Sequence, residues 1–221
     1  MIRALFMDFY GTVAQEDDAQ VAEICRRVAQ AAGLEAQRVE LLWRDRLRRA
    51  CAGAHGEAFV RQRAIERDTL AELAACLGAR VDADELCAPV FAHWMKPPLY
   101  DDARALFASC PVPIYIVSNI DRADVEAALD WNGLKPAGVF TSEDARAYKP
   151  RPELFRLALR ETGRVGGEVL HVGDSLGSDV EGARGAGIGA LWLNRRGAAV
   201  PQGVASIDSL TSICAFLTDS Q

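Results

Sequence analysis

The segment Ile2–Val13, which reads IRALFMDFYGTV, decides the fold of this 221-residue chain. Its opening residues form an apolar run broken only by Arg3, which is typical of a buried β-strand. The run ends at Asp8, and the pair Gly11-Thr12 follows shortly after. A carboxylate at the carboxyl end of a buried strand lies where open α/β sheets place their ligand crevice.

A second acidic cluster lies much later in the chain, where Gly173–Asp179 reads GDSLGSD and follows the apolar run 168–172. If both runs are strands of one parallel sheet, their carboxylates share one crevice. Several carboxylates in one crevice need a bound cation, a shared proton or a covalent role for one of them.

Composition restricts the classes of function. Half of the residues are hydrophobic and the net charge is −6, which fits one domain with an insertion and gives no basic footprint for nucleic acid. We find no signal peptide and no apolar run of the roughly 18–20 residues that a bilayer requires. Six scattered cysteines without a CxxC pair read as reduced core residues. We therefore expect a cytoplasmic protein with no nucleic-acid or membrane partner.

Hydrophobic periodicity divides the chain into a helical block and an α/β region. The block is expected to contain helices near 18–32, 36–52, 57–77 and 83–94. In the α/β region, strands are expected near 112–117, 139–140, 168–172 and 190–193. The helices between and after them are expected near 101–109, 122–131, 152–162, 178–186 and 207–217, with Asp121 capping the second of these.

Strands that alternate with helices predict an α/β fold with a Rossmann-like, doubly wound parallel sheet. The expected core comprises residues 1–14 and 97–221, and residues 15–96 form a helical cap inserted after the first strand. An insertion at this point lies beside Asp8, where it is positioned to cover the crevice.

Polar residues lie at four strand ends or loops. In chain order they are Asp8 with Thr12, Ser118-Asn119, Lys149-Pro150, and Asp174 with Asp179. With these residues in this order, the sequence resembles the haloacid dehalogenase-like (HAD) hydrolase superfamily, with a C1-type cap. The resemblance implies that Asp8 is a nucleophile that forms a covalent aspartyl intermediate. The resemblance also covers essentially the whole chain.

The remaining motif residues take roles implied by the same resemblance. Thr12 is expected to orient a carboxylate, and Ser118 with Asn119 to bind a phosphoryl oxygen at a helix start. Lys149 is expected to balance the Asp8 charge and the substrate oxyanions. Asp179 is expected to orient Lys149 or a metal-bound water.

The resemblance further implies a Mg²⁺ cofactor, because carboxylate and carbonyl oxygens are the ligands that this ion prefers. The expected ligands are Asp8, the backbone carbonyl of Tyr10, and Asp174. Mg²⁺ would let an anionic nucleophile approach an anionic substrate.

Tyr10 departs from the phosphatase pattern, in which an Asp at this position acts as general acid and base. Tyrosine, with a pKa near ~10, is a poor base at neutral pH. Asp-x-Tyr-Gly-Thr is instead similar to L-2-haloacid dehalogenases, whose departing halide needs no proton. Leu42-Trp43-Arg44 and Trp192–Arg195 also resemble dehalogenase segments. Asp174 is nevertheless typical of the metal-dependent phosphatases.

The sequence therefore predicts a HAD-type hydrolase, foremost a Mg²⁺-dependent phosphomonoesterase acting through an aspartyl-phosphate on Asp8. The first alternative is a 2-haloacid dehalogenase acting through an Asp8 ester, and the second is a catalytically weak HAD-fold binding protein. The expected partner is a small anionic substrate, a phosphate ester, that Arg44 from the cap helps to bind. A monomer and a homodimer are both compatible with the sequence.

Overall fold

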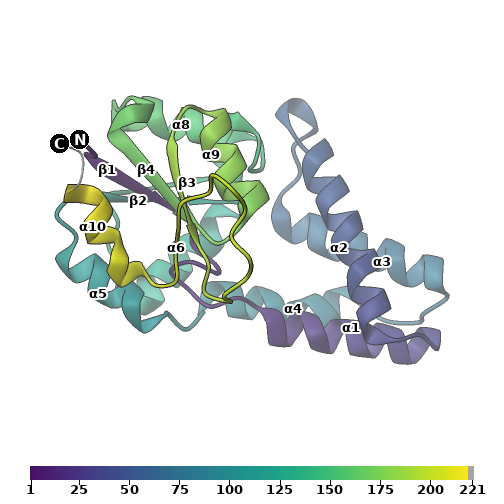
Figure 1. Cartoon of the computed structure of the whole chain (residues 1–221). Coiled ribbons are helices and arrows are strands. Elements are labelled where there is room, and N and C mark those ends of the chain that lie inside the picture. Colours follow the sequence, from purple (N-terminus) through teal and green to yellow (C-terminus); the bar gives the residue numbers. More distant parts are fainter. Residues whose placement is uncertain (219–221) are drawn as a thin grey trace.

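A computed structural model describes residues 1–218, and it contains a single parallel sheet with helices on both faces (Figure 1). The strand order is β3-β2-β1-β4-β5-β6, so β1 and β4 lie side by side at the centre. The α/β fold class predicted from the sequence is confirmed. The strands are β1 (Ala4–Met7), β2 (Ile114–Ser118), β3 (Gly138–Thr141), β4 (Val169–Gly173), β5 (Gly189–Leu193) and β6 (Ser206–Ile207).

Strand β1 is completely buried because helices cover both faces of the sheet. Leu5 and Met7 pack into the same hydrophobic cluster as residues of α5 (Asp101–Ser109), α6 (Arg122–Asn132) and α10 (Ile213–Thr218). Ala4 and Phe6 point the other way, toward α8 (Pro152–Thr162) and α9 (Gly182–Gly185). This explains why β1 reads as a continuous apolar run.

The first four of the five α-helices between β1 and β2 form a helical block beside the sheet (Figure 1). Trp43 and Leu70 lie in its core, where Trp43 Nε1 donates a hydrogen bond of 3.1 Å to Thr69 Oγ1. Among residues 1–218, none of the helices combines the length and hydrophobicity that crossing a bilayer requires. The four helices are α1 (Asp18–Ala32), α2 (Ala36–Gly53), α3 (Gln62–Leu77) and α4 (Ala83–Met95).

Two chain segments run side by side where the helical block meets the core. Ala14 pairs with Leu99, and backbone N–H groups donate from Gln15 to Pro98 (2.9 Å) and from Tyr100 to Val13 (3.1 Å). This bridge follows directly on β1, so it places the helical block at the carboxyl edge of the sheet.

The structure corrects several local predictions. The helix expected at 57–77 is divided into a short turn, η1 (Gly56–Ala58), and α3. The helix expected at 207–217 begins at Ile213, after β6 and the turn η4 (Leu210–Ser212). Strand β6 and the short helix α7 (Ser142–Ala145) were not predicted, because elements of two to four residues have too little periodicity to detect. The helix expected at 178–186 is also divided, into a π-helix, η3 (Leu176–Glu181), and α9. One further turn is η2 (Gly166–Glu168).

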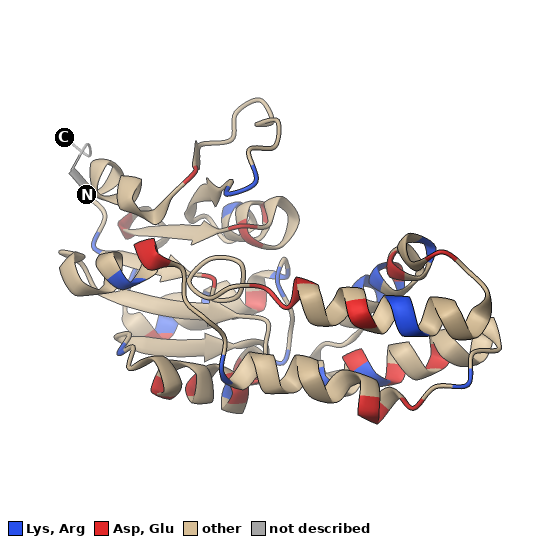
Figure 2. Ribbon diagram, turned by 90° about the horizontal axis from the view of Figure 1, so that it is seen from below, with Lys and Arg blue, Asp and Glu red and all other residues tan. Residues whose placement is uncertain are grey.

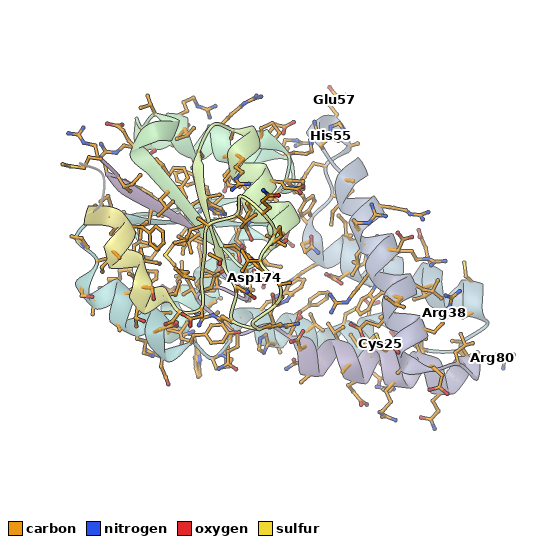
Figure 3. The ribbon with its side chains drawn as sticks, viewed as in Figure 1. Cys25, Arg38, His55, Glu57, Arg80 and Asp174 are labelled. Carbon is orange, nitrogen blue, oxygen red and sulfur yellow. The ribbon has the colours of Figure 1, made fainter. Side chains whose placement is uncertain are left out.

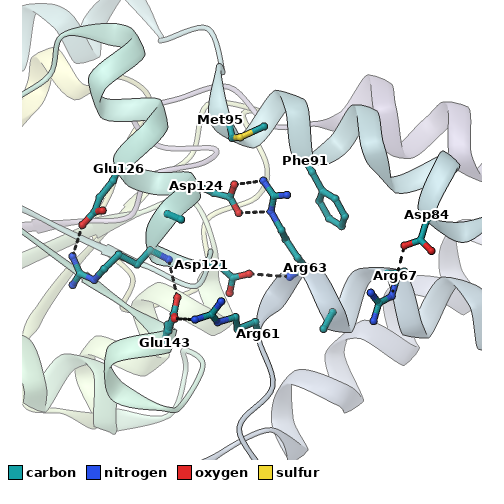
Figure 4. Close-up of a pocket in the computed structure, with 13 residues that line it drawn as sticks. Arg61, Arg63, Arg67, Asp84, Phe91, Met95, Asp121, Asp124, Glu126 and Glu143 are labelled. Carbon is teal, nitrogen blue, oxygen red and sulfur yellow. Dashed lines mark hydrogen bonds and ion pairs between the residues drawn. The ribbon is translucent and has the colours of Figure 1, made fainter.

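The prediction that Asp121 caps its own helix α6 is wrong, because its side chain makes no such bond. Its carboxylate instead accepts from the N–H groups of Gln62 (2.8 Å) and Arg63 (3.1 Å), at the start of α3 in the helical block (Figure 4). Arg63 also pairs with Asp124 on α6. The first turns of α3 and α6 therefore hold the block and the core together.

Candidate active site

Lys149 connects two carboxylates at the carboxyl ends of the central strands. Its ammonium donates to Asp8 Oδ1 and to Asp179 Oδ1, each at 2.7 Å, and to the Val117 carbonyl at 2.9 Å. All three of its partners are buried, and the Lys149 side chain is only 2% exposed. The structure thus brings together three residues that lie far apart in the sequence.

Asp179 is held from two further sides. His171 Nε2 lies 3.0 Å from Asp179 Oδ1, and the Ser175 N–H donates to Asp179 Oδ2 at 3.0 Å. His171 belongs to β4, is fully buried and packs against the edge of Phe155. The sequence analysis missed His171, although it is the one ionisable side chain within an otherwise apolar strand.

Asp174 completes the group of carboxylates, from the loop that follows β4 (Figure 3). One carboxylate oxygen each from Asp8, Asp174 and Asp179 can be chosen so that all lie within 4.8 Å of one another. Trp192 Nε1 donates to the Asp174 carbonyl at 2.7 Å and so fixes this loop. Trp192 was predicted to belong to a dehalogenase-like segment, but its role in positioning Asp174 was not predicted.

The electrostatics of these groups follow from burial and from the single cation. Burial raises the pKa of Asp8, while Lys149 opposes this rise and the Asp179 charge adds to it. Burial and the charges of Asp8 and Asp179 raise the pKa of Asp174 to about 7. Burial alone would also raise the pKa of Asp179, but Lys149 and His171 hold it well below its usual value. Three carboxylates therefore lie near one ammonium, that of Lys149. Burial lowers the pKa of Lys149, but the charges of Asp179 and Asp8 outweigh this effect and raise it.

Ser118 and Asn119 follow β2 and contact the same loop as Lys149. The Asn119 side chain accepts from the Lys149 N–H at 2.7 Å and donates to the Lys149 carbonyl at 3.3 Å. Ser118 is buried, and its hydroxyl accepts from the Ile120 N–H at 3.2 Å. Asn119 therefore holds the backbone that carries the lysine, a contact that the sequence did not indicate.

The hydroxyl groups of Tyr10 and Thr12 are not directed at the carboxylates. Tyr10 donates to the Trp94 carbonyl at 2.5 Å, and burial raises its pKa far above the usual value. The Thr12 hydroxyl is buried and has no hydrogen-bond partner within residues 1–218, so it orients no motif carboxylate there. Its carbonyl accepts from Arg195 at 2.9 Å.

Gly11 allows the backbone to pass very close to two acidic side chains. Its φ is +84°, and an added Cβ would lie 2.5 Å from Glu16 Oε1 and 2.7 Å from Asp174 Oδ2. Both the backbone angle and the close approach therefore require glycine. Glu16, which the sequence analysis did not single out, lies beside Asp174, and burial together with Asp174 raises its pKa to about 8.

Arg44 lies at the edge of the site, but its charge is already paired with a carboxylate of its own helix. It lines a cavity that also contains Asp174, but it pairs with Glu40 at 2.8 Å and its side chain is 59% exposed. Most of the other arginines of the block have carboxylate partners too. Basic and acidic residues are interspersed along its helices (Figure 2). Arg44 is thus a peripheral candidate for substrate binding.

The arrangement of these strand ends matches a known family. The family model of haloacid dehalogenase-like hydrolases matches residues 2–187. The chain therefore belongs to the haloacid dehalogenase-like hydrolases, as its motifs predicted.

Curated relatives match parts of this chain. The chain is 36% identical over 103 residues to haloacid dehalogenase-like hydrolase domain-containing protein 3 of Danio rerio, covering 44% of this chain and 42% of that protein. It is 34% identical over 133 residues to phosphoserine phosphatase of Thermus thermophilus, covering 53% and 49%. The chain thus spans about half the length of the curated relatives it matches.

Among solved structures, L-2-haloacid dehalogenase from Xanthobacter autotrophicus has a similar fold, with a TM-score of 0.75 at 21% identity. The match covers 98% of each chain. Similarity at this level of identity shows the fold, and the residues of the site must distinguish between a phosphatase and a dehalogenase.

Proposed function

We propose that this protein is a Mg²⁺-dependent phosphomonoesterase with Asp8 as its nucleophile. One observation carries the proposal: Asp8, Asp174 and Asp179 face one another around a single ammonium, that of Lys149. Such a group is short of positive charge, which a divalent cation would supply. A metal-independent dehalogenase has no need of the third carboxylate, Asp174.

The donor atoms fit Mg²⁺. Asp8 and Asp174 offer carboxylate oxygens near each other. The backbone carbonyl of Tyr10, two residues after Asp8, would be the third ligand. Such oxygen ligands suit Mg²⁺, which usually completes its shell with water. When bound, Mg²⁺ polarises the phosphoryl group and reduces its repulsion of the nucleophile.

The chain's own residues define two chemical steps. Lys149 binds Asp8 Oδ1, so we assign the attack on phosphorus to Oδ2. The new O–P bond forms as the bond from phosphorus to the leaving oxygen breaks, and that oxygen takes a proton from water. Water then attacks the phosphorus of the aspartyl-phosphate, which releases phosphate and restores Asp8. Lys149 stays protonated throughout and stabilises the phosphoryl oxygens.

The helical block, residues 15–96, is proposed to act as the cap of this site. It meets the core at the bridge between Ala14 and Leu99 and stands at the sheet edge that carries Asp8. A cap at this place would exclude water and select a small phosphate ester.

Turnover of an activated aryl phosphate is expected to require the metal, and this tests the proposal directly. Phosphate release with Mg²⁺ should fall at least about 100-fold in EDTA, and 2-chloropropionate should release no chloride under either condition. Chloride release in EDTA would instead support the dehalogenase. Metal or anion binding without turnover of either compound would support a binding protein.

The dehalogenase remains the second candidate because of Tyr10. Its hydroxyl is committed to the Trp94 carbonyl, so no acid at this position protonates a leaving group. A halide leaves without a proton, whereas an alkoxide needs one. The absence of an acid at this position therefore favours the dehalogenase, and a phosphatase built on this site has to draw the leaving group's proton from water.

Replacing Tyr10 by Phe is expected to leave turnover within about twofold of wild type, because the hydroxyl takes no part in proton transfer. The variant should lose about 1 kcal/mol of unfolding free energy with the bond to the Trp94 carbonyl. Steady-state kinetics and urea unfolding measure the two effects. A loss of activity of about 100-fold or more would instead mean that Tyr10 donates the proton to the leaving group.

A further inference from the structure

A cavity of about 350 Å³ opens beside Asp174, between the helical block and the core. The cavity therefore shares one residue, Asp174, with the carboxylate group around Lys149 in the candidate active site. It is the natural space for whatever is attached to the phosphoryl group. Three apolar side chains line it, namely Val21, Trp43 and Leu47. Five acidic side chains also line it, namely Glu16, Asp17, Asp18, Glu66 and Asp174, together with the arginines Arg44 and Arg196.

The two arginines do not balance this acidic lining, because each already has a carboxylate partner. Arg44 pairs with Glu40 at 2.8 Å, and Arg196 pairs with Asp18 at 2.7 Å. Both pairs are largely exposed, so they form the rim of the cavity rather than its wall.

Glu66 is one of the carboxylates on the wall of the cavity that lack a cationic partner among the described residues. It comes from α3, is partly buried and accepts one side-chain hydrogen bond, from the neutral amide of Gln62 at 2.9 Å. Within residues 1–218, no lysine or arginine forms an ion pair with it. Asp17 is held in a similar way by the neutral Trp94 Nε1 at 2.8 Å.

The positive groups of the site lie elsewhere. Lys149 and the proposed Mg²⁺ bind the phosphoryl end, where Asp8, Asp174 and Asp179 are used. Glu16, Glu66 and Asp17 then remain as carboxylates without a basic partner in the space for the leaving group. A leaving group with a carboxylate or a second phosphate would be repelled, and a neutral one would leave these carboxylates unpaired.

We infer that the natural substrate is a phosphomonoester whose leaving group is a short alkyl chain with an ammonium, and that Glu66 binds this ammonium. The inference rests on the proposed phosphatase function and specifies its substrate class. Val21, Trp43 and Leu47 supply the apolar surface that the alkyl part contacts. Glu66 acts as a specificity-determining residue, outside the chemical steps.

The protonation behaviour of Glu66 agrees with a missing cationic partner. Burial, with a smaller contribution from the Asp17 charge, raises the pKa of Glu66 to about 7. An ammonium bound next to the carboxylate would favour its charged form and offset that rise.

The kinetic test compares two esters of equal size, phosphoethanolamine and n-propyl phosphate, in wild type and in Glu66→Gln. Wild type should prefer the amine ester by about tenfold or more in kcat/KM, the range of a hydrogen bond to a charged group. Glu66→Gln keeps the shape but removes the charge, so the preference should fall to about unity. Glu23→Gln, which changes an exposed carboxylate on α1, is the matched control and should keep the wild-type ratio.

A binding measurement keeps the inference testable even if neither ester is hydrolysed. Calorimetry with Mg²⁺ present would compare 2-aminoethylphosphonate and n-propylphosphonate, which differ only in the ammonium. Tighter binding of the amine that is lost in Glu66→Gln supports the inference, and equal binding of the two phosphonates overturns it. Absence of hydrolysis for every ester, with the aminophosphonate still preferred, would overturn the phosphatase function alone.

Discussion

Asp8→Asn is expected to abolish turnover and to leave the fold intact. An amide cannot form the aspartyl intermediate, so the rate should fall by at least about 10⁴-fold. The fold should persist because the Asp8 N–H still donates to the Val172 carbonyl at 2.9 Å and Lys149 still pairs with Asp179. Steady-state kinetics with an aryl phosphate and circular dichroism on the same preparation measure the two properties.

The control for this variant is Asp130→Asn, which changes an exposed carboxylate on α6 and should leave turnover at the wild-type rate. A second readout follows the intermediate itself. Acid-quenched wild type should carry a phosphoryl group on the peptide that contains Asp8, and Asp8→Asn should carry none. Residual activity of more than a few per cent, with the fold preserved, would mean that another group attacks the substrate.

The positions of Asp8, Asp174 and Asp179 could be predicted from the apolar runs before them. Asp8 and Asp174 come at the ends of such runs, and Asp179 follows Asp174 by five residues. In a parallel sheet, the carboxyl ends of neighbouring strands share one edge, so sequence-distant residues at those ends must meet. The register confirms this for β1 and β4, where Met7 lies opposite Val172. The end of a strand is marked in the local sequence, so hydrophobic periodicity is sufficient to predict which residues lie there.

Other features depend on contacts that no local pattern records. Asp121 has the sequence position of a cap for α6, yet its carboxylate serves the start of α3, in the helical block. His171 is hidden in an apolar strand, and only the fold brings Asp179 within 3.0 Å of it. Both cases involve partners chosen by tertiary packing, which overrides the local preference.

The substrate pocket was the least predictable part of the site. Glu66 and Trp43 lie on different helices of the block, and their common cavity with Asp174 depends on how the block meets the core. The sequence named Arg44 as a substrate-binding candidate because Leu42-Trp43-Arg44 resembles a dehalogenase segment and a positive charge suits an anionic substrate, but it could not choose among the arginines of the cap. The structure pairs that arginine with Glu40 and leaves Glu66 facing the cavity, so the charge pattern of the wall differs from the one expected.

Lys149→Met is expected to damage both activity and stability, since one ammonium balances two buried carboxylates. Without it, Asp8 and Asp179 face each other with no cation, which should cost about 3–5 kcal/mol of unfolding free energy near neutral pH. Turnover should fall by about 10²–10³-fold, because the phosphoryl oxygens lose their positive partner. Urea unfolding and steady-state kinetics measure the two losses, with the exposed Lys135→Met as matched control.

The pH dependence of this variant distinguishes lost charge from lost packing. In wild type, Lys149 lowers the pKa of Asp179, so that carboxylate contributes stability above its unfolded pKa, and the contribution disappears as the pH falls. In Lys149→Met the buried carboxylates must take up protons at a higher pH than in wild type, and protonation relieves their repulsion. The stability difference between variant and wild type should therefore shrink as the pH is lowered from 8 toward about 4. If the stability difference does not change with pH, the lost stability comes from packing of the lysine side chain. The ammonium would then not be the group that keeps Asp8 charged.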